Sequence, residues 1–474
     1  MKPRLQHARR AWRCAVGCVG AVVWIALMPL AAWAQSPSLP FLTCADLSVL
    51  DEMEQAGAVY QDAQGPADPL VLLRDRGLNT VRLRLWHTPS LGHDGLEEVL
   101  AMAERIHAHD LDLMLTIHYS DTWADPAQQA KPATWRTASF SALRDSVRSY
   151  TERVVAALTA QGTSPTLIQI GNEITGGMLW PDGRVGGTYD TPAQWQQLAD
   201  LLQAGIDGAR AADDRVAIML HVDNGGSAET VRWFFDNIRD AGVALDLIGL
   251  SYYPWWHGRL DDLERTLATT AERYQLPVMV VETAYPWTLD WFDSTHNIVG
   301  LSDQLLPDFP ASPDGQAAFI TTVRQAVAGV EGDLGQGLCY WAPEHTATTS
   351  VGSPWENLAL FNDAGMLLPG AATLGGRTST VAVETPTEVT AAVTVHPNPA
   401  SAQLTMRLNA SAPLCPEVTF YNALGQAHAQ QALRCGSGAQ EVAVDVSTWA
   451  AGVYLYTVTA SGQLVGRGTV AVAR

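Results

Sequence analysis

Eight short apolar runs within one block, residues 41–343, limit the fold of this chain more than any other feature. Most of them are followed by an amphipathic stretch with the period of a helix. The runs cover residues 41–49, 80–86, 112–119, 167–173, 216–222, 247–253, 277–283 and 337–342. Eight strand-helix units in one domain-sized block predict an α/β fold with a closed (β/α)8 TIM barrel rather than an open sheet.

Polar and aromatic residues gather at the carboxyl ends of these runs, where such a barrel places its active site. Glu173 ends the fourth run and Glu282 lies at the end of the seventh, and strands four and seven face each other across a barrel mouth. Retaining hydrolysis of a glycosidic bond needs one carboxylic acid and one carboxylate, about 5 to 5.5 Å apart. A lone glutamate here is more often part of a structural ion pair, but two favour catalysis. We therefore predict Glu173 as acid/base and Glu282 as nucleophile, with Asn172 holding the sugar 2-hydroxyl or, alternatively, capping the backbone.

Two arginines, Arg82 and Arg84, lie two residues apart on the second run, so their side chains face the same way. Unpaired guanidinium groups inside a barrel are costly, so each needs a partner. We predict that Arg84, nearer the mouth, keeps Glu282 ionised, and the sequence leaves open an ion pair of Arg82 with Asp46. Tyr253 is expected either to donate a hydrogen bond to Glu282 or to pack in the core.

Stacking faces for sugar rings are plentiful, because the chain holds 16 Trp. Any one of them can equally well lie in the core. The residues that we expect to bind substrate along the cleft, besides those above, are His118, Asp121, Trp123, Trp256, Trp341 and Trp355.

Several motifs together resemble family 53 of the glycoside hydrolases, the endo-β-1,4-galactanases of clan A, over nearly all of residues 41–370. They are ADLS at 45–48, NTVRLRLW at 79–86, HYSDTWADP at 118–126, GNE at 171–173, SYYP at 251–254, ETAYP at 282–286 and WEN at 355–357. The resemblance implies an endo-acting, retaining hydrolase of β-1,4-galactan, the side chain of type I arabinogalactan in pectin. It also implies Glu173 as proton donor and Glu282 as nucleophile. Another clan A endo-glycanase (a β-mannanase, xylanase or cellulase) and a non-catalytic glycan-binding surface protein are the alternatives.

Bacterial members of that family can bind calcium in the loop after the seventh strand. The corresponding stretch here, DWFDSTHN at 290–297, offers the oxygen ligands that Ca²⁺ prefers but not in alternate positions. We therefore predict no cofactor and no metal site, and calcium stays open.

The first 34 residues read as a secretory signal peptide. Four arginines precede an apolar run at 14–31, and Ala32-Trp33-Ala34 matches a cleavage site. A membrane anchor and a lipoprotein modified at Cys18 are weaker alternatives, because the apolar run is short and the residues before Cys18 lack the usual leucine. The sequence thus predicts a secreted or cell-surface protein, with no membrane span after signal cleavage.

Export makes disulfides between the remaining cysteines feasible. Cys44 and Cys339 lie on the first and last predicted strands, which a closed barrel makes neighbours, and a bridge or two buried thiols are equally compatible with the sequence. We favour a bridge between Cys415 and Cys435, because it would stabilise a small C-terminal unit.

A change of composition marks the end of the catalytic domain, which we expect to span residues 35–376. A linker at 377–390 leads to short alternating runs at 391–474, typical of a small all-β immunoglobulin-like sandwich. The motifs HPNPA at 396–400, YNALG at 421–425 and AGVY at 451–454 resemble the sorting domains of the type IX secretion system, which implies the secretion machinery as a partner. A carbohydrate-binding module is the alternative, but Trp449 is its only Trp.

The charge balance narrows the partners further. With 29 basic and 49 acidic residues the net charge is -20, which argues against nucleic acid and anionic membrane surfaces as partners and is compatible with a neutral polysaccharide. We expect the mature protein to be a monomer.

Overall fold

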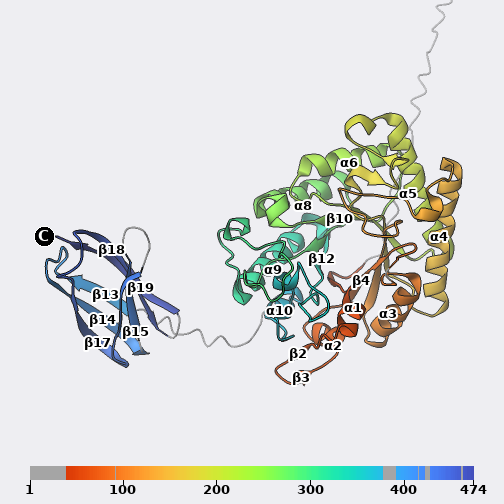
Figure 1. The fold of residues 1–474 in the computed structure, drawn as a ribbon. Coiled ribbons are helices and arrows are strands. Elements are labelled where there is room, and N and C mark those ends of the chain that lie inside the picture. The colour runs from red at the N-terminus through yellow and green to blue at the C-terminus, as the bar shows by residue number, and fades with distance from the viewer. Residues whose placement is uncertain are drawn as a thin grey trace, which may run out of the picture. The chain divides into compact units, whose positions relative to one another are not determined.

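The computed structural model describes residues 39–90, 92–376, 391–414, 416–421, 427–460 and 463–473. The chain divides between residues 378 and 379 into two compact units, which are treated separately below (Figure 1). The expected signal peptide at 1–34, the linker at 377–390 and Cys415 of the expected Cys415–Cys435 bridge lie outside the described residues. Within the described part of the chain, no helix combines the length and the apolar character needed to cross a membrane.

The first unit is a closed barrel of eight parallel strands, which confirms the predicted fold. Around the barrel the order is β1-β12-β11-β10-β9-β6-β5-β4, and β4 pairs with β1 to close the ring. Each strand falls on one of the eight apolar runs: β1 (Leu42–Asp46), β4 (Thr80–Leu85), β5 (Asp112–Ile117), β6 (Leu167–Ile170), β9 (Ala217–Val222), β10 (Leu247–Ser251), β11 (Val278–Thr283) and β12 (Gly335–Trp341). Two short hairpins, β2/β3 (Gln61–Asp62, Gly65–Pro66) and β7/β8 (Gly177–Met178, Gly183–Arg184), lie in the connections.

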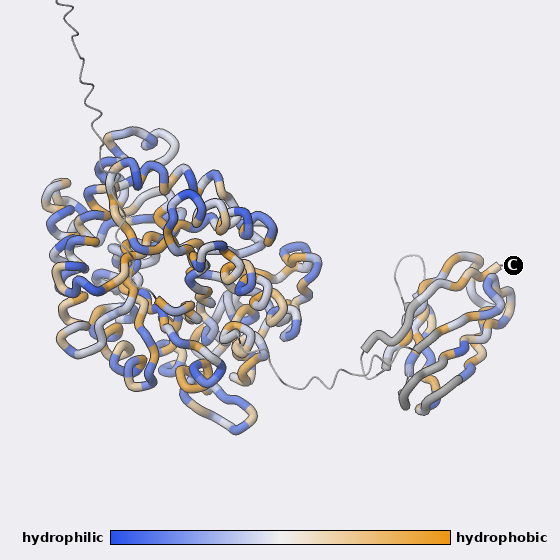
Figure 2. The backbone as a smooth tube through the Cα atoms, turned by 180° about the vertical axis from the view of Figure 1, so that it is seen from behind, coloured by the Kyte–Doolittle hydropathy of each residue, from blue (hydrophilic) through white to orange (hydrophobic). Residues whose placement is uncertain are grey.

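Helices surround the strands, and their apolar faces cover the outside of the barrel. Figure 2 shows apolar strands enclosed by helices of mixed hydropathy. Side-chain caps begin several of the helices: Ser139 accepts from the Ala142 N–H at α4, and Ser227 accepts from the Thr230 N–H at α6. The helices are α1 (Leu50–Gln55), α2 (Pro69–Arg74), α3 (Leu96–Ala108), α4 (Phe140–Ala160), α5 (Pro192–Ala212), α6 (Ala228–Asp240), α7 (Pro254–His257), α8 (Leu260–Tyr274), α9 (Pro313–Ala328) and α10 (Gly370–Leu374).

The interior of the barrel is apolar toward the amino ends of the strands and polar toward their carboxyl ends. Its apolar part is a buried cluster: Leu42, Cys44, Met114, Leu167, Ala217, Met219, Leu247, Met279, Val281 and Cys339. Two residues further along three of these strands, the inward positions are taken by Asp46, Gln169 and His221, and on β10 Ser251 lies four residues beyond Leu247; all four side chains are buried. The strand period therefore places a buried polar layer directly beneath the mouth.

A disulfide joins the first and last strands of the barrel. Cys44 and Cys339 are register partners in the β1–β12 pair, and their sulfur atoms are bonded. Of the two alternatives that the sequence left open, the structure has the bridge, and it closes a segment with a sequence separation of 295 residues.

The pairing of β10 with β11 contains a shift of register next to the site. Leu250 pairs with Val280, but Ser251 pairs with Glu282, so one residue of β11 is skipped. Met279 and Val281 belong to the inner cluster, so strict alternation would turn Glu282 outward. The irregularity re-aims its side chain into the mouth, a common use of a β-bulge beside an active site.

The second unit consists of two antiparallel sheets. One has the order β13-β14-β17 and the other β16-β15-β18-β19. Their bounds are β13 (Ala391–His396), β14 (Gln403–Leu414), β15 (Pro416–Tyr421), β16 (Ala427–Ala432), β17 (Gly436–Asp445), β18 (Gly452–Ala460) and β19 (Gln463–Val472). Trp449 is buried in the shared core, 5.1 Å from the ring of Phe420 between centroids, so it offers no exposed platform for a sugar.

Candidate active site

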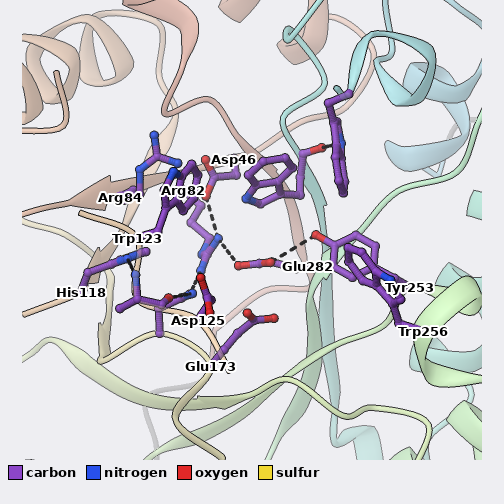
Figure 3. Close-up of a pocket in the computed structure, with 14 residues that line it drawn as sticks. Asp46, Arg82, Arg84, His118, Trp123, Asp125, Glu173, Tyr253, Trp256 and Glu282 are labelled. Atoms are coloured by element: carbon purple, nitrogen blue, oxygen red, sulfur yellow. Dashed lines mark hydrogen bonds and ion pairs between the residues drawn. The ribbon is translucent and has the colours of Figure 1, made fainter. Parts of the chain in front are cut away.

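A cleft opens at the carboxyl ends of the barrel strands, and ten of the eleven residues predicted for the site line it (Figure 3). These ten are Arg84, His118, Trp123, Asn172, Glu173, Tyr253, Trp256, Glu282, Trp341 and Trp355. Asp46, Arg82, Ala124 and Asp125 complete the lining. In Figure 3 the carboxyl groups of Glu173, which follows β6, and Glu282, on β11, lie near each other in this cleft.

Glu282 is held by two donors. One carboxylate oxygen lies 2.8 Å from Nη1 of Arg82, and the other accepts a hydrogen bond of 3.2 Å from the Tyr253 hydroxyl, the contact expected for that tyrosine. Glu282 as a whole is 6% exposed. Burial raises the pKa of Glu282, whereas Arg82 and the Tyr253 hydrogen bond act to lower it. Both donors stabilise the ionised form, which a nucleophile requires.

Glu173 has a different environment. It follows β6 with a left-handed backbone (φ 47°, ψ 51°), a sparsely populated conformation for a residue with a side chain. Its Oε1 accepts a hydrogen bond of 2.7 Å from the Ser251 hydroxyl. Burial and the negative charge of Glu282 raise the pKa of Glu173 well above its usual range. The group therefore favours its protonated form while Glu282 is ionised.

Arg82, not Arg84, is the cation at Glu282. Arg82 is 2% exposed, and its Nη1 bridges Glu282 and Asp46, at 2.8 and 2.7 Å. Arg84, one layer nearer the mouth, instead forms an ion pair of 2.8 Å with Asp94. The prediction that Arg84 keeps Glu282 ionised is therefore wrong, because the deeper arginine reaches the carboxylate, and it serves Asp46 at the same time.

The remaining donors of Arg82 tie the nucleophile to the residue before Glu173. Its Nη2 donates to Oδ1 of Asn172 at 2.8 Å and to Oε1 of Gln169 at 3.2 Å. The Asn172 amide in turn donates to the Ala124 carbonyl at 2.9 Å. One amide N–H of Asn172 is left over for a substrate hydroxyl.

His118 is a neutral hydrogen-bonding group in the wall. Its Nδ1 accepts from the Ala124 N–H at 3.3 Å, so Nε2 carries the ring proton. Burial and the charges of Arg84 and Arg82 lower the pKa of His118 well below its usual value. It can therefore donate to a sugar hydroxyl without adding charge to the site.

The tryptophans of the cleft differ in exposure, which separates those that present a ring face to solvent from those that are packed into the cleft wall. Trp256 is 59% exposed and Trp123 37%, whereas Trp355 is 5% exposed and holds Trp341 through a ring contact with centroids 4.5 Å apart. Trp123 is also stacked by the guanidinium of Arg84, 4.0 Å from the ring centroid. Arg84 thus orients one aromatic face of the cleft.

Asp121 is the one predicted residue that the structure keeps out of the cleft lining. Its two carboxylate oxygens accept from the Thr88 N–H at 3.0 Å and the Ala133 N–H at 2.7 Å. It therefore braces two loops against each other. Its motif, which also contains four residues of the cleft lining, gave no sign of this difference, because neighbouring loop positions point in different directions.

The sequence reasoning missed Ala124 and Asp125 in the cleft lining and the contact of Ser251 with Glu173. It also missed the roles of Arg82 and Asp46 at the nucleophile. Asp46 and Ser251 end their strands at inward-facing positions, so strand period together with strand ends is a signal that points to them. For Asp125 the motif at 118–126 is the available signal.

The stretch at 290–297, which the sequence left open for calcium, lies in the loop after β11. Asp293 there already accepts from the Ser353 N–H at 2.7 Å and the Thr295 N–H at 2.5 Å, as a loop brace would. Among the described residues, three side chains elsewhere, Asp51, His93 and Glu98, converge with ligand atoms within 4.8 Å of one another. All three are partly exposed.

Comparison with known proteins matches each of the two units to a protein family. Residues 42–374 match the family model "Glycosyl hydrolase family 53", and residues 394–469 match "Secretion system C-terminal sorting domain". The second match confirms the expected export to the cell surface or beyond it.

Relatives support the first assignment. The chain is 43% identical over 335 residues to an uncharacterized protein of Niallia circulans, covering 69% of this chain and 92% of that one. It is 35% identical over 355 residues to the arabinogalactan endo-beta-1,4-galactanase of Cellvibrio japonicus, covering 72% and 92%. The GH53 catalytic domain of Ignisphaera aggregans superimposes with a TM-score of 0.66 at 33% identity, covering 71% of this chain and 97% of that domain. With the closed barrel and the facing glutamates, these matches show that the chain belongs to glycosyl hydrolase family 53, whose members are glycosidases.

Proposed function

We propose that the protein is a secreted endo-β-1,4-galactanase that hydrolyses type I arabinogalactan with retention of anomeric configuration. The galactanase name of the Cellvibrio japonicus relative supports the substrate class. The unequal environments of the two carboxyl groups support the mechanism, and this asymmetry is the observation that carries it. Glu282 receives Arg82 and Tyr253, whereas Glu173 receives one serine hydroxyl.

In the first step Glu282 attacks the anomeric carbon while Glu173 gives its proton to the departing glycosidic oxygen. Formation of the glycosyl ester removes the negative charge of Glu282, which lowers the pKa of Glu173. Glu173 then acts as a base and takes a proton from the incoming water, whose oxygen attacks the same carbon. Asn172 is suited to hold the 2-hydroxyl through its remaining amide hydrogen, and Trp123 and Trp256 offer faces to neighbouring sugars.

Azide rescue tests both roles in one design. We expect Glu282→Ala and Glu173→Ala each to lower hydrolysis of linear β-1,4-galactan by several orders of magnitude. With an activated aryl galactoside, azide restores turnover in both. Glu282→Ala gives the α-glycosyl azide, of inverted configuration, and Glu173→Ala gives the β-glycosyl azide, because only the latter keeps a glycosyl-enzyme intermediate.

Near wild-type turnover in either variant, or the same azide anomer from both, would overturn the assignment. Substrate class is tested separately with the wild-type protein on β-1,4-galactan, β-1,3-linked galactan, mannan, xylan and cellulose. Cleavage of mannan, xylan or cellulose but not of galactan would place the protein with other clan A endo-glycanases. No cleavage of any of the five would favour the glycan-binding alternative.

A further inference from the structure

A chain of buried side chains runs from the barrel interior to the carboxyl group of Glu173. The Nε2 of Gln169 lies 3.0 Å from Nδ1 of His221, and Nε2 of His221 lies 2.8 Å from the Ser251 hydroxyl oxygen. That hydroxyl donates to Oε1 of Glu173 at 2.7 Å. Gln169, His221 and Ser251 are each 0% exposed, so none of them can touch a polysaccharide. Ser251 contacts Glu173 directly, and His221 reaches Glu173 through Ser251.

The contacts at Nδ1 determine which nitrogen of His221 carries the proton. The Glu173 backbone N–H, which can only donate, faces Nδ1 at 3.4 Å. The Gln169 amide nitrogen lies 3.0 Å from Nδ1, and its two hydrogens are shared with the Gly171 carbonyl at 2.9 Å and Oδ1 of Asn172 at 3.1 Å. One acceptor is near, Oδ1 of Asn172 at 3.2 Å, but it already accepts from Arg82 and Gln169. Nδ1 is therefore an acceptor and the proton is on Nε2, where it points at Ser251.

The charges around the chain keep His221 neutral. Burial is the largest cause that lowers the pKa of His221 well below its usual value, and Arg82, His118 and His257 lower it further. None of the causes of this shift is a carboxylate that would raise the pKa. The pKa of Glu173 is raised mainly by burial, and the charges of Glu282 and Asp223 raise it further. The Ser251 hydrogen bond and the charge of Arg82 act to lower it. His221 is thus a fixed dipole and not a second acid.

With Nε2–H directed at the serine oxygen, the single hydroxyl proton of Ser251 has only one useful direction, toward Glu173. Accepting that bond at Oε1 leaves Oε2 as the oxygen that carries the transferable proton. When that proton moves to the glycosidic oxygen, Glu173 becomes a carboxylate and the Ser251 bond becomes charge-assisted, hence stronger. The same bond holds the carboxylate in place while Oε2 receives a proton from water.

We propose that His221 and Ser251 are positioning residues that fix which oxygen of Glu173 gives and takes the proton, and that favour its carboxylate form between the two steps. This rests on the proposed role of Glu173 as acid/base. The structure assigns His221 the task of orienting Ser251, and Ser251 the task of orienting Glu173.

Substitutions at both residues separate positioning from packing. Ser251→Ala removes the donor, and His221→Asn keeps an amide near Gln169 but loses the donor at the Nε2 position. Two matched variants restore the contact: Ser251→Thr keeps a hydroxyl, and His221→Gln places an amide N–H where Nε2–H was. The readout is the pH profile of kcat/KM on β-1,4-galactan, whose alkaline limb reports the free-enzyme acid.

Loss of the donor destabilises the carboxylate form, so the pKa of Glu173 rises. We expect the alkaline limb to move up by about one pH unit in Ser251→Ala and His221→Asn, the size of one hydrogen bond to a charged group. In Ser251→Thr and His221→Gln it should return to within a few tenths of the wild-type position. On an aryl galactobioside with a good leaving group, whose departure needs little protonation, the fall in kcat/KM should be at least tenfold smaller than on galactan.

Equal losses on both substrates with an unmoved alkaline limb would overturn the proposal and mean that the two residues only pack. Should Ser251→Ala or His221→Asn fail to fold, ¹⁵N shifts of labelled histidines in the full wild-type chain decide, with the His221 signal assigned by its loss in the folded His221→Gln variant. We expect a neutral Nε2–H imidazole from pH 5 to 8, and the opposite tautomer or a titrating ring would contradict us. Failure of the proposed function itself would look different, because the wild-type protein would then leave galactan uncut.

Discussion

Two arginines one layer apart on β4 have different roles because they reach different carboxylates. Arg82 is at the level of Asp46 and Glu282, and bonds both. Arg84 faces the same way but meets Asp94 and the ring of Trp123. Burial alone would lower the pKa of Arg82, but the negative charges of Glu282 and Asp46 outweigh it and raise the pKa. Arg82 therefore stays protonated at this depth, and its positive charge favours the ionised form of Glu282.

We expect Arg82→Met to move the acid limb of the kcat/KM profile on galactan to higher pH, by about one to three units. The reason is that Glu282 loses the cation that lowers its pKa, so the nucleophile becomes protonated at a pH where it is normally ionised. Arg84→Met is the matched control, and its acid limb should stay in place whatever happens to KM. An acid limb that moves in Arg84→Met and not in Arg82→Met would contradict the assignment.

The same change should also cost stability, because Asp46 is left buried without its cation. Removing one partner of a buried ion pair costs about 3 to 5 kcal/mol, which a denaturant titration of Arg82→Met can measure. Rates should therefore be measured at a temperature where the variant is folded.

Strand period predicted which side chains of the site face inward, but not what each one contacts. Glu173, Glu282 and Asn172 follow from strand ends and the motif around them. That Arg82 rather than Arg84 pairs with Glu282 could not be predicted, because the sequence does not give the depth in the barrel at which a side chain meets its partner. Asp121 likewise lies in a motif of cleft residues and yet hydrogen-bonds to loop backbone.

At the scale of elements, all eight strands lie where the apolar runs predicted them. The shift of register between β10 and β11 could not be predicted from the sequence. The register shift between Leu250 and Ser251 in the β10–β11 pairing, which skips Val281, leaves no mark in the residue types of either strand. The shift depends on how β10 and β11 are aligned with each other in the folded barrel, which is a property of the tertiary structure. The pairing of β1 with β12 was foreseen from closure, but the bond between Cys44 and Cys339 required the register itself.

Closing the barrel covalently should stabilise it, since a bridge limits the unfolded chain. We expect the double variant Cys44→Ala/Cys339→Ala to lose about 2 to 5 kcal/mol of unfolding free energy for the barrel unit, measured by denaturant titration. Unfolding the wild-type protein in reductant should reproduce that loss. The double variant with and without reductant is the control for the cysteines of the second unit. A barrel transition that is unchanged in the double variant would show that the bridge does not contribute.

At the scale of the whole molecule, the two units divide the work between chemistry and export. The first unit holds every residue of the cleft. The second has its tryptophan buried in the core and matches a sorting domain. The sequence predicted both units from a change in composition and period, without the contacts inside either of them.

Deleting residues 391–474 should therefore leave kcat/KM on galactan within about twofold of the full chain, since a separate core need not support the first one. The same deletion should keep the protein from reaching the outside of the producing cell, which fractionation measures. A large rise in KM on polymeric galactan, with small aryl substrates unaffected, would instead indicate that the second unit binds polysaccharide.

The offset between β10 and β11 has a consequence for anyone who redesigns this barrel. The direction of Glu282 is a joint property of two neighbouring strands, and so the segment that carries the glutamate cannot be transplanted by itself. A recipient scaffold would need both strands and their misalignment, or else the acidic group would end up among the surrounding helices, chemically intact and out of reach of any sugar.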